Sequence, residues 1–206
     1  MAGRSRAQRR LERPVQILEA AFEEFVEHGY AATRLEDVAA RAGVTKGTIY
    51  FYFENKEHVF ASMVRELWLP LHQEVTLFLQ KETERSTTEF LRAFLHFLHQ
   101  ALARDRRASE IFRLLIAEAR RFPDLLDEHY ARFARPVLER LGQTLKQGAA
   151  QGEFRNTALP EFAEVLIGPA LTLNVWSLLF ANRKPVDLDR HFEATIDLFL
   201  RGLLPR

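Results

Sequence analysis

Apolar residues recur along this chain at the three- and four-residue intervals of amphipathic helices, with charged residues between them. Glycines, prolines and capping residues divide this pattern into about nine segments. The expected helices cover residues 14–29, 33–43, 46–53, 56–80, 86–101, 106–122, 123–150, a segment from the end of a loop at 152–160 to 182, and 187–204. Outside one aromatic stretch near residue 50, no segment alternates polar and apolar residues in the manner of a strand, so the sequence predicts an all-α fold.

The stretch 41-RAGVTKGTIYFYF-53 departs from this pattern, because four consecutive aromatic residues follow a β-branched one. Propensity alone favours a strand at 48–53. A single strand would leave its backbone groups without partners, so we expect a helix from Lys46 instead. On that helix one side carries Ile49, Tyr52 and Phe53, and the other carries Lys46, Gly47, Tyr50 and Phe51. The outward aromatic residues need a partner surface.

Several helix ends carry specific signals. Pro14 suits the first position of the first helix, and Gly29 suits the left-handed position that ends it. Thr33 and Glu36 have the spacing of a capping box. Pro136 lacks a backbone donor and predicts a kink within 123–150.

Charge is unevenly distributed along the chain. Residues 1–13 contain five arginines and one glutamate, so this segment carries +4 and the rest of the chain −3. The pattern is typical of a basic, flexible arm, either merely solvated or bound to a polyanion. No apolar run of the kind found in signal peptides follows these arginines. The chain contains no cysteine, which excludes disulfides, thiol nucleophiles and cysteine-bearing metal sites and fits a reducing compartment.

One uncharged segment, residues 165–182, approaches the length of a membrane span. It contains a Gly-Pro pair and several polar residues, and no second segment resembles it. We therefore expect a buried helix and no association with a membrane.

Residues 33–53 have the spacing of a helix-turn-helix, in which two short helices meet at a glycine turn. Ala39 is small enough for the helices to approach each other, Gly43 supplies the turn and Val44 lies beneath it. Val38 and Ile49 are expected to form the shared core.

At this point the sequence resembles a known family. The segment 29-GYAATRLEDVAARAGVTKGTIYFYFENKEHVF-60 is similar to the DNA-binding module of the tetracycline-repressor (TetR) family, and the dense part of the resemblance covers about residues 14–64. The resemblance implies a basic arm at 1–13, a DNA-binding domain at 14–58 and a ligand-binding and dimerisation domain at 59–206. It also implies a set of DNA-contacting residues, namely Thr33, Arg34, Thr45, Lys46, Gly47, Thr48, Tyr50, Phe51, Tyr52 and Lys56.

In such proteins the short helix enters the major groove, where lysines and hydroxyls meet phosphates or base edges and an apolar ring can contact thymine methyls. Two of the residues have an alternative role: Tyr52 is as well suited to the core, and Thr45 to capping its own helix. Arg34 stands where the family often has Ser or Thr, which leaves it free to reach a phosphate.

An enzyme is the first alternative. His96 and His99 lie three residues apart and could form a metal pair, but they are surrounded by apolar residues and no carboxylate accompanies them. The sequence has no phosphate-binding glycine loop, no G-x-S-x-G and no H-E-x-x-H. We therefore expect no enzymatic activity and no cofactor or metal.

The second alternative is a DNA-binding regulator or architectural protein without an effector. About 140 residues lie outside the helix-turn-helix domain, and a chain segment of this length favours a ligand-binding domain. The aromatic residues of this segment suggest a cavity for a small hydrophobic effector. The candidate ligand-binding residues are Trp68, His72, Phe94, His96, Phe112, Glu118, His129, Asn174 and Trp176.

The last two helices favour a homodimer, because the segment to 182 is apolar on two faces and the next helix has a matching face. The candidate interface residues are Phe162, Leu166, Leu173, Trp176, Phe180, Phe192, Ile196 and Phe199. The expected function is that of a cytoplasmic transcriptional repressor that leaves operator DNA when the effector binds.

Overall fold

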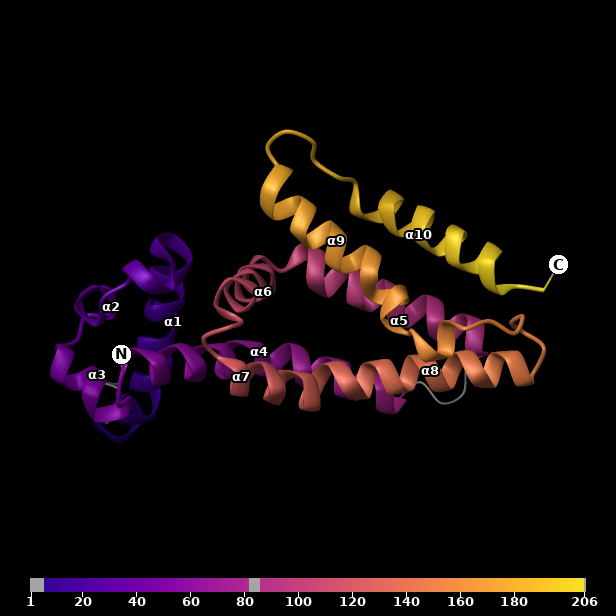
Figure 1. The fold of residues 1–206 in the computed structure, drawn as a ribbon. Coiled ribbons are helices and arrows are strands. Elements are labelled where there is room, and N and C mark those ends of the chain that lie inside the picture. The colour runs from indigo at the N-terminus through magenta and orange to yellow at the C-terminus, as the bar shows by residue number, and fades with distance from the viewer. Residues whose placement is uncertain (1–5, 82–85, 206) are drawn as a thin grey trace, which may run out of the picture. The chain divides into compact units, whose positions relative to one another are not determined.

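The computed structural model describes residues 6–81 and 86–205, and Figure 1 labels their helices. These residues form ten α-helices, one π-helical turn (η1) and one 3₁₀ turn (η2), and they contain no strand. In chain order they are α1 (Arg6–Ala32), α2 (Leu35–Arg41), α3 (Lys46–Tyr52), α4 (Lys56–Lys81), α5 (Thr87–Arg104), α6 (Arg106–Glu118), α7 (Pro123–His129), η1 (Tyr130–Ala134), α8 (Arg135–Ala150), η2 (Leu159–Glu161), α9 (Glu164–Phe180) and α10 (Leu188–Leu203). The all-α prediction is confirmed, and α7, η1 and α8 together correspond to the expected helix at 123–150.

The first helix begins earlier than predicted. Helix α1 starts at Arg6, so Pro14 lies inside it, and residues 6–13 of the predicted flexible arm have helical backbone. Residues 1–5 of that arm lie outside the described part of the chain. At the other end Gly29 has φ 76°, a left-handed conformation that suits glycine, and it interrupts the helix where the sequence predicts.

The predicted kink near Pro136 takes the form of the π-helical turn η1. Pro136 cannot donate to the carbonyl of Arg132, four residues earlier, so the backbone widens just before it. The residues of this turn therefore present their side chains at angles that a regular helix would not give.

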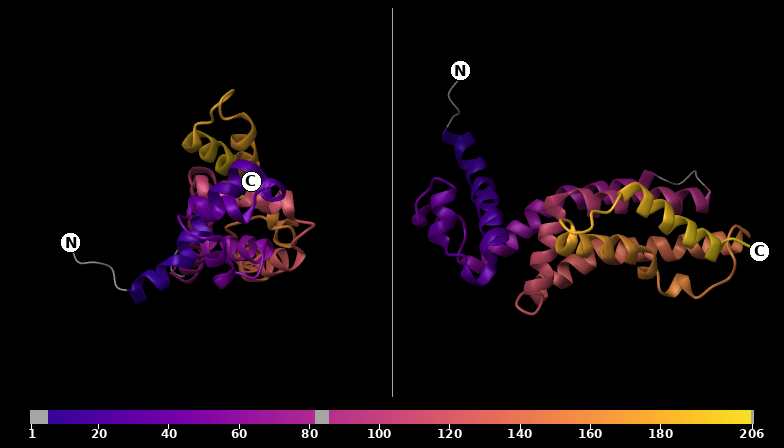
Figure 2. Two further views of the ribbon diagram at one scale, coloured as in Figure 1. Left: turned by 90° about the vertical axis from the view of Figure 1, so that its left-hand side faces the viewer. Right: turned by 90° about the horizontal axis from the view of Figure 1, so that it is seen from above.

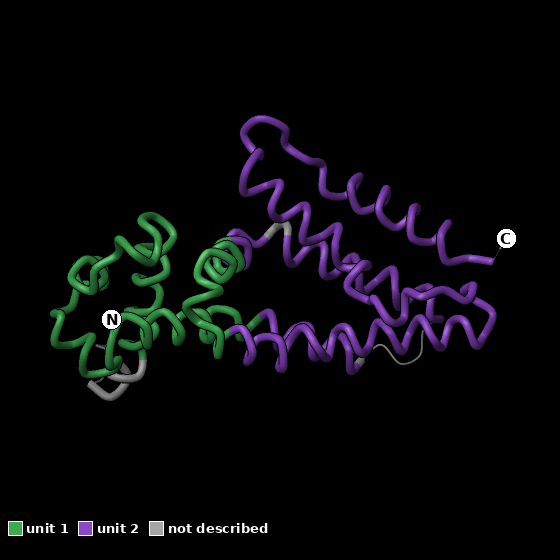
Figure 3. The backbone as a smooth tube through the Cα atoms, in the orientation of Figure 1, with its two compact units in different colours: residues 1–70, 110–125 green, residues 71–109, 126–206 purple. Residues whose placement is uncertain are grey.

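The chain forms two compact units, coloured green and purple in Figure 3. Unit 1 comprises residues 1–70 and 110–125, and unit 2 comprises residues 71–109 and 126–206. This division differs from the predicted boundary after residue 58, because the first turns of α4 and most of α6 pack with the N-terminal helices.

Unit 1 contains the helix-turn-helix and an aromatic cluster behind it. Phe25 of α1 stacks on Tyr30, and Phe60 of α4 stacks on Phe122, with ring centroids 5.6 and 4.6 Å apart. Arg113 of α6 donates to the carbonyl of Val26. These contacts hold α1, α4 and residues 110–125 together as one core.

Unit 2 is built around α5, against which α8, α9 and α10 pack (Figures 1 and 2). The buried core is formed mainly by the apolar faces of these helices, with Phe94, Leu141 and Ile196 among its least exposed side chains. No helix in the described ranges is both long enough and apolar enough to cross a membrane.

Candidate nucleic-acid interface

A glycine turn joins α2 to α3. Gly43 has φ 63°, and the amide of Val44 donates to the carbonyl of Ala39 at 2.9 Å, which closes the turn. A side chain at position 43 would be strained by this φ. Val38 and Ile49, both fully buried, form the core between the two helices as predicted.

Helix α3 is held at its first turn by its own side chains. The Thr45 hydroxyl accepts from the Thr48 amide at 3.2 Å, and the two hydroxyls are 2.9 Å apart. Thr45 thus caps the helix. Because Thr45 remains exposed, capping does not remove it from the candidate interface.

The outward face of α3 combines basic, aromatic and small residues. Tyr50 and Phe51 are 49% and 65% exposed, although aromatic residues of this size are usually buried, and Lys46 and Gly47 are exposed beside them. A lysine and a phenol can meet phosphates, an exposed phenyl ring can meet thymine methyls, and a glycine lets the backbone approach the groove. This face has the chemistry of a DNA-reading surface.

Lys46 is paired within the protein. Its ammonium donates to the Glu36 carboxylate of α2 at 2.5 Å and lies 5.6 Å from the centroid of the Tyr50 ring. The hydrogen bond from Lys46 lowers the pKa of Glu36, and the same bond raises the pKa of Lys46. Both side chains are about half exposed, so the pair lies at the surface.

Two of the candidate DNA-contacting residues have structural roles instead. The predicted capping box is absent, because Thr33 is buried and donates back to the carbonyls of Glu24 and Gly29, and the N-cap of α2 is Arg34 without a side-chain bond. Lys56 donates to the carbonyls of Tyr30, Ala31 and Thr33 at 2.8, 3.3 and 3.0 Å. Since an ammonium has three protons, Lys56 is fully engaged there, and neither residue belongs to our proposed interface.

The other candidates lie at or near the outward face. Arg34 is exposed, and Thr48 is half-buried beside Thr45. Tyr52 is half-buried, with its ring edge against Phe51 at 4.9 Å and a tilted contact with Phe53 at 6.4 Å. Its intermediate position is compatible with both of the roles that the sequence left open.

The candidate ligand-binding residues are divided between the two units. Trp68, Phe112 and Glu118 lie in unit 1, and the remaining six lie in unit 2. Phe94 is fully buried in the core of unit 2. Their use by a ligand stays a prediction.

The structure brings two of the six together. His72 of α4 and His129 of α7 lie 5.5 Å apart by ring centroid, and both stack on Phe133 of the π-helical turn at 4.7 and 5.2 Å. Burial lowers the pKa of His129 to about 4, and the nearby His72 adds to that effect. Burial likewise lowers the pKa of His72, so the neutral form is favoured at both rings.

Asn174 of α9 joins separate helices through its amide group. The side chain is 1% exposed, and its nitrogen donates to the Leu102 carbonyl at 2.6 Å and to the Ser109 hydroxyl at 2.7 Å. It thereby joins α9 to the end of α5 and to Ser109, whereas its carbonyl oxygen is buried and has no hydrogen-bond partner among the described residues.

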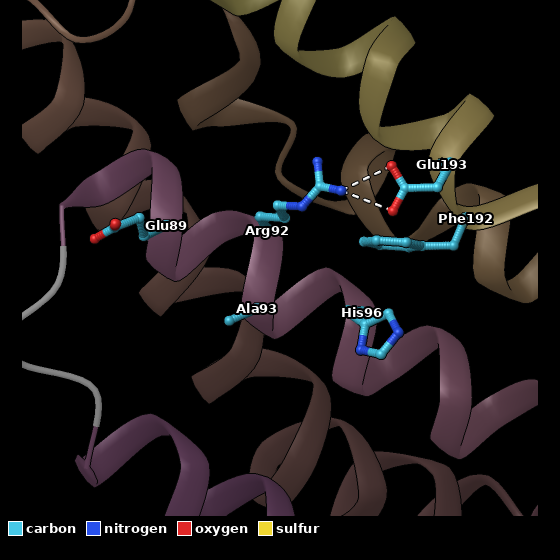
Figure 4. A pocket seen from close by; sticks show the side chains of 6 residues that line it. All are labelled: Glu89, Arg92, Ala93, His96, Phe192 and Glu193. Atoms are coloured by element: carbon cyan, nitrogen blue, oxygen red, sulfur yellow. Dashed lines mark hydrogen bonds and ion pairs between the residues drawn. The ribbon is translucent and has the colours of Figure 1, made fainter. Parts of the chain in front are cut away.

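His96 lines a surface hollow of about 490 Å³ between α5 and α10 (Figure 4). The Arg92 guanidinium spans the hollow and donates to both carboxylate oxygens of Glu193 at 2.7 Å. His96 lies edge-on to the Phe192 ring rather than forming a pair with His99, which stacks on His191. Among the described residues, no group of three or more potential ligands could hold a metal ion.

The candidate dimer residues are also divided, here by exposure. Leu166, Leu173, Phe192 and Ile196 are buried in unit 2 itself, so we remove them from the proposed interface. Phe162 precedes α9 rather than lying within it, and like Trp176 it is exposed, whereas Phe180 and Phe199 are half-buried. Four exposed residues outside that interface set lie on the same two helices: Val165, Val175, Leu179 and Leu198. The sequence pattern placed the first three of them on the second apolar face of the segment that ends at 182.

Other contacts escaped prediction because they join residues distant in the sequence. Glu36 and Lys46 belong to different helices, and Phe133 of the π-helical turn stacks on His72 of α4. No periodic spacing links these residues, although an acidic residue ten positions before Lys46 was visible in the sequence.

Comparison with known proteins places the chain in a family. Residues 17–63 match the family described as bacterial regulatory proteins, tetR family, and residues 87–202 match the AefR-like transcriptional repressor, C-terminal domain. The chain belongs to the TetR family of transcriptional regulators, and the predicted DNA-binding repressor is confirmed at this level.

Individual relatives agree with this assignment. The "Probable acrEF/envCD operon repressor" of Escherichia coli K12 is 28% identical over all of this chain and 92% of its own length. SmeT is the repressor of a multidrug efflux pump of Stenotrophomonas maltophilia. In its complex with triclosan, SmeT is 29% identical to this chain and superposes with a TM-score of 0.70. The match covers 94% of this chain and 92% of SmeT. AibR in complex with isovaleryl coenzyme A and operator DNA is 21% identical with TM-score 0.74 over 91% and 97%, a likeness of fold.

Proposed function

We propose that this protein is a cytoplasmic, homodimeric repressor that binds operator DNA through α3 and leaves it when a small lipophilic effector binds in its C-terminal region. The observation that carries the DNA-reading part is the outward face of α3, where Lys46, Tyr50 and Phe51 remain exposed. An exposed aromatic pair beside a lysine has no role in the core of its own unit and suits a groove lined by phosphates and bases.

A homodimer is supported by apolar residues left uncovered on α9 and α10. Leu179 and Leu198 are 64% and 70% exposed, and Val165 and Trp176 are exposed as well. A two-fold pairing of these helices would bury this surface and present two copies of α3 to successive turns of the duplex, about 34–36 Å apart.

The effector class is supported by a relative of this chain. SmeT, at 29% identity, forms a complex with triclosan, a small aromatic compound. The stacked rings of His72, His129 and Phe133 give this chain an aromatic cluster to which such a compound could bind. A regulator without an effector is the alternative, and binding of operator DNA unchanged by every compound tested would favour it.

Selection of bound duplexes from a random pool tests the DNA-reading function directly. We expect a palindromic consensus, bound by the wild-type protein and not by a folded Lys46→Ala/Tyr50→Ala variant. Recovery of random sequences, or equal binding by that variant, would refute α3 as the reader.

The selected site then serves as the probe for the effector. Triclosan and stearoyl-coenzyme A are titrated into the DNA complex, with glucose and glutamate as polar controls, while thermal unfolding is followed in parallel. Release of DNA together with a raised melting temperature for a lipophilic compound supports the proposal. Release by the polar metabolites alone contradicts the effector class.

A further inference from the structure

The reading face of α3 contains a lysine that is already bound. Lys46 donates to the Glu36 carboxylate at 2.5 Å, so an acceptor on the protein occupies the place that a phosphate or a guanine edge would take. The two residues lie on different helices of the helix-turn-helix, both in unit 1, and neither is needed by the core beneath them.

DNA binding must therefore exchange one partner for another. If Lys46 stays with Glu36, it contributes little attraction for DNA, and the carboxylate repels nearby phosphates. If Lys46 turns to the DNA, the pair with Glu36 is lost and must be compensated by a well-placed acceptor. A correctly docked operator offers such an acceptor, whereas DNA bound loosely through its backbone does not hold one in a fixed place.

Resting on the proposed function of α3, we propose that Glu36 is a specificity-determining residue that withholds Lys46 from non-operator DNA. The carboxylate does not read a base itself. Because the ion pair with Glu36 must be broken before Lys46 can contact DNA, Lys46 increases the affinity for operator and hardly changes the affinity for other sequences. The ratio of the two affinities is thereby raised at some cost to both.

Glu36→Gln tests this role, because the amide keeps the size of the side chain and removes its charge. We expect non-operator DNA to bind about two- to fivefold tighter, the range in which exposed ion pairs contribute, with a smaller gain for operator. The plot of log affinity against log salt concentration for non-operator DNA should become steeper by about one phosphate contact.

Asp37→Asn is the matched control. Asp37 is exposed in the same first turn of α2, so its substitution removes the same charge at nearly the same place, but it forms no ion pair with a described side chain. Fluorescence anisotropy with the selected operator and a scrambled duplex of equal length gives both affinities for each variant. Circular dichroism and thermal unfolding confirm that the variants are folded.

A double variant isolates the pair. In a Lys46→Ala background, Glu36→Gln should have no more effect than Asp37→Asn, because there is no lysine left to release. Equal effects of Glu36→Gln and Asp37→Asn with Lys46 present would overturn the proposal, as would an undiminished effect of Glu36→Gln without Lys46. If Lys46→Ala/Tyr50→Ala leaves binding unchanged, the reading face itself is misassigned, which is a separate failure.

Discussion

Phe122, which follows α6, stacks on Phe60 of α4 with ring centroids 4.6 Å apart, inside the unit that carries the reading helix. Phe122 also meets the edge of Tyr30, and the neighbouring Arg121 lies over that ring and 3.7 Å from Glu57. Phe60 and Phe122, 62 positions apart in the sequence, thus share one core. The support of the helix-turn-helix includes a segment from the middle of the chain.

We expect Phe122→Ala to lower the free energy of unfolding of unit 1 by about 1–3 kcal/mol, since it removes two ring contacts from a half-buried site. Denaturant titration followed by circular dichroism measures the change. Ile116→Ala, on the exposed side of α6, is the control and should change stability by less than about 0.5 kcal/mol. Equal effects of the two substitutions would mean that the Phe122 cluster does not stabilise the unit.

Lys46→Ala should weaken specific binding of operator by about 1–3 kcal/mol if Lys46 reads a base edge in the complex. Tyr50→Phe removes only the hydroxyl and should cost less than Tyr50→Ala, since the ring and its packing are kept. Anisotropy titrations at two salt concentrations separate phosphate contacts, whose effect depends on salt, from base contacts. If neither the Lys46 variant nor the Tyr50 variants bind operator more weakly than wild type, the outward face of α3 is not the DNA-reading surface.

Lys56→Met should destabilise unit 1 by about 1–3 kcal/mol, because three backbone carbonyls at the end of α1 lose their donor. The apolar stem is largely preserved, so the loss reports on the ammonium. Thermal unfolding measures this effect, and DNA affinity per folded molecule should stay within about twofold of wild type. A large loss of affinity without a loss of stability would return Lys56 to the interface.

The free energy of unfolding should fall as the pH decreases from about 6.5 to about 4. Folding depresses the pKa of His129 from its ordinary value of 6.5 to about 4, so in this window the unfolded chain binds a proton that the folded chain does not. His72 shifts in the same direction. Chemical denaturation at pH 7 and pH 5 should show a smaller difference for His129→Gln than for wild type; an unchanged difference would assign the pH dependence to other groups.

Gly148→Ala should destabilise unit 2 by about 1–3 kcal/mol, because an added Cβ would lie 2.2 Å from the Phe154 ring and 2.8 Å from the Thr87 hydroxyl. Gly202→Ala in α10 meets nothing within 4 Å and should be neutral or stabilising by up to about 1 kcal/mol. Denaturant midpoints compare the two variants. A stable Gly148→Ala would mean that Phe154 can move aside without loss of packing.

The helices were predictable from the sequence because their signals are local. Gly43 and Thr45 end one helix and begin the next through φ preference and capping, both of which act within a few residues. The spacing of Val38 and Ile49 likewise fixed the inward side of the helix-turn-helix, and with it the outward side that carries Lys46, Tyr50 and Phe51. The family resemblance of this segment rests on the same residues.

Only the tertiary structure decided which exposed or polar candidates remain available. Lys56 looked like a phosphate contact, but the end of α1 folds back beside it and supplies three carbonyls. Leu166 and Ile196 looked ready for a partner subunit, but α9 and α10 bury them against α5 of the same chain. Burial and pairing depend on helices distant in sequence, which no periodicity encodes, so the same residue type can be a contact, a cap or part of the core.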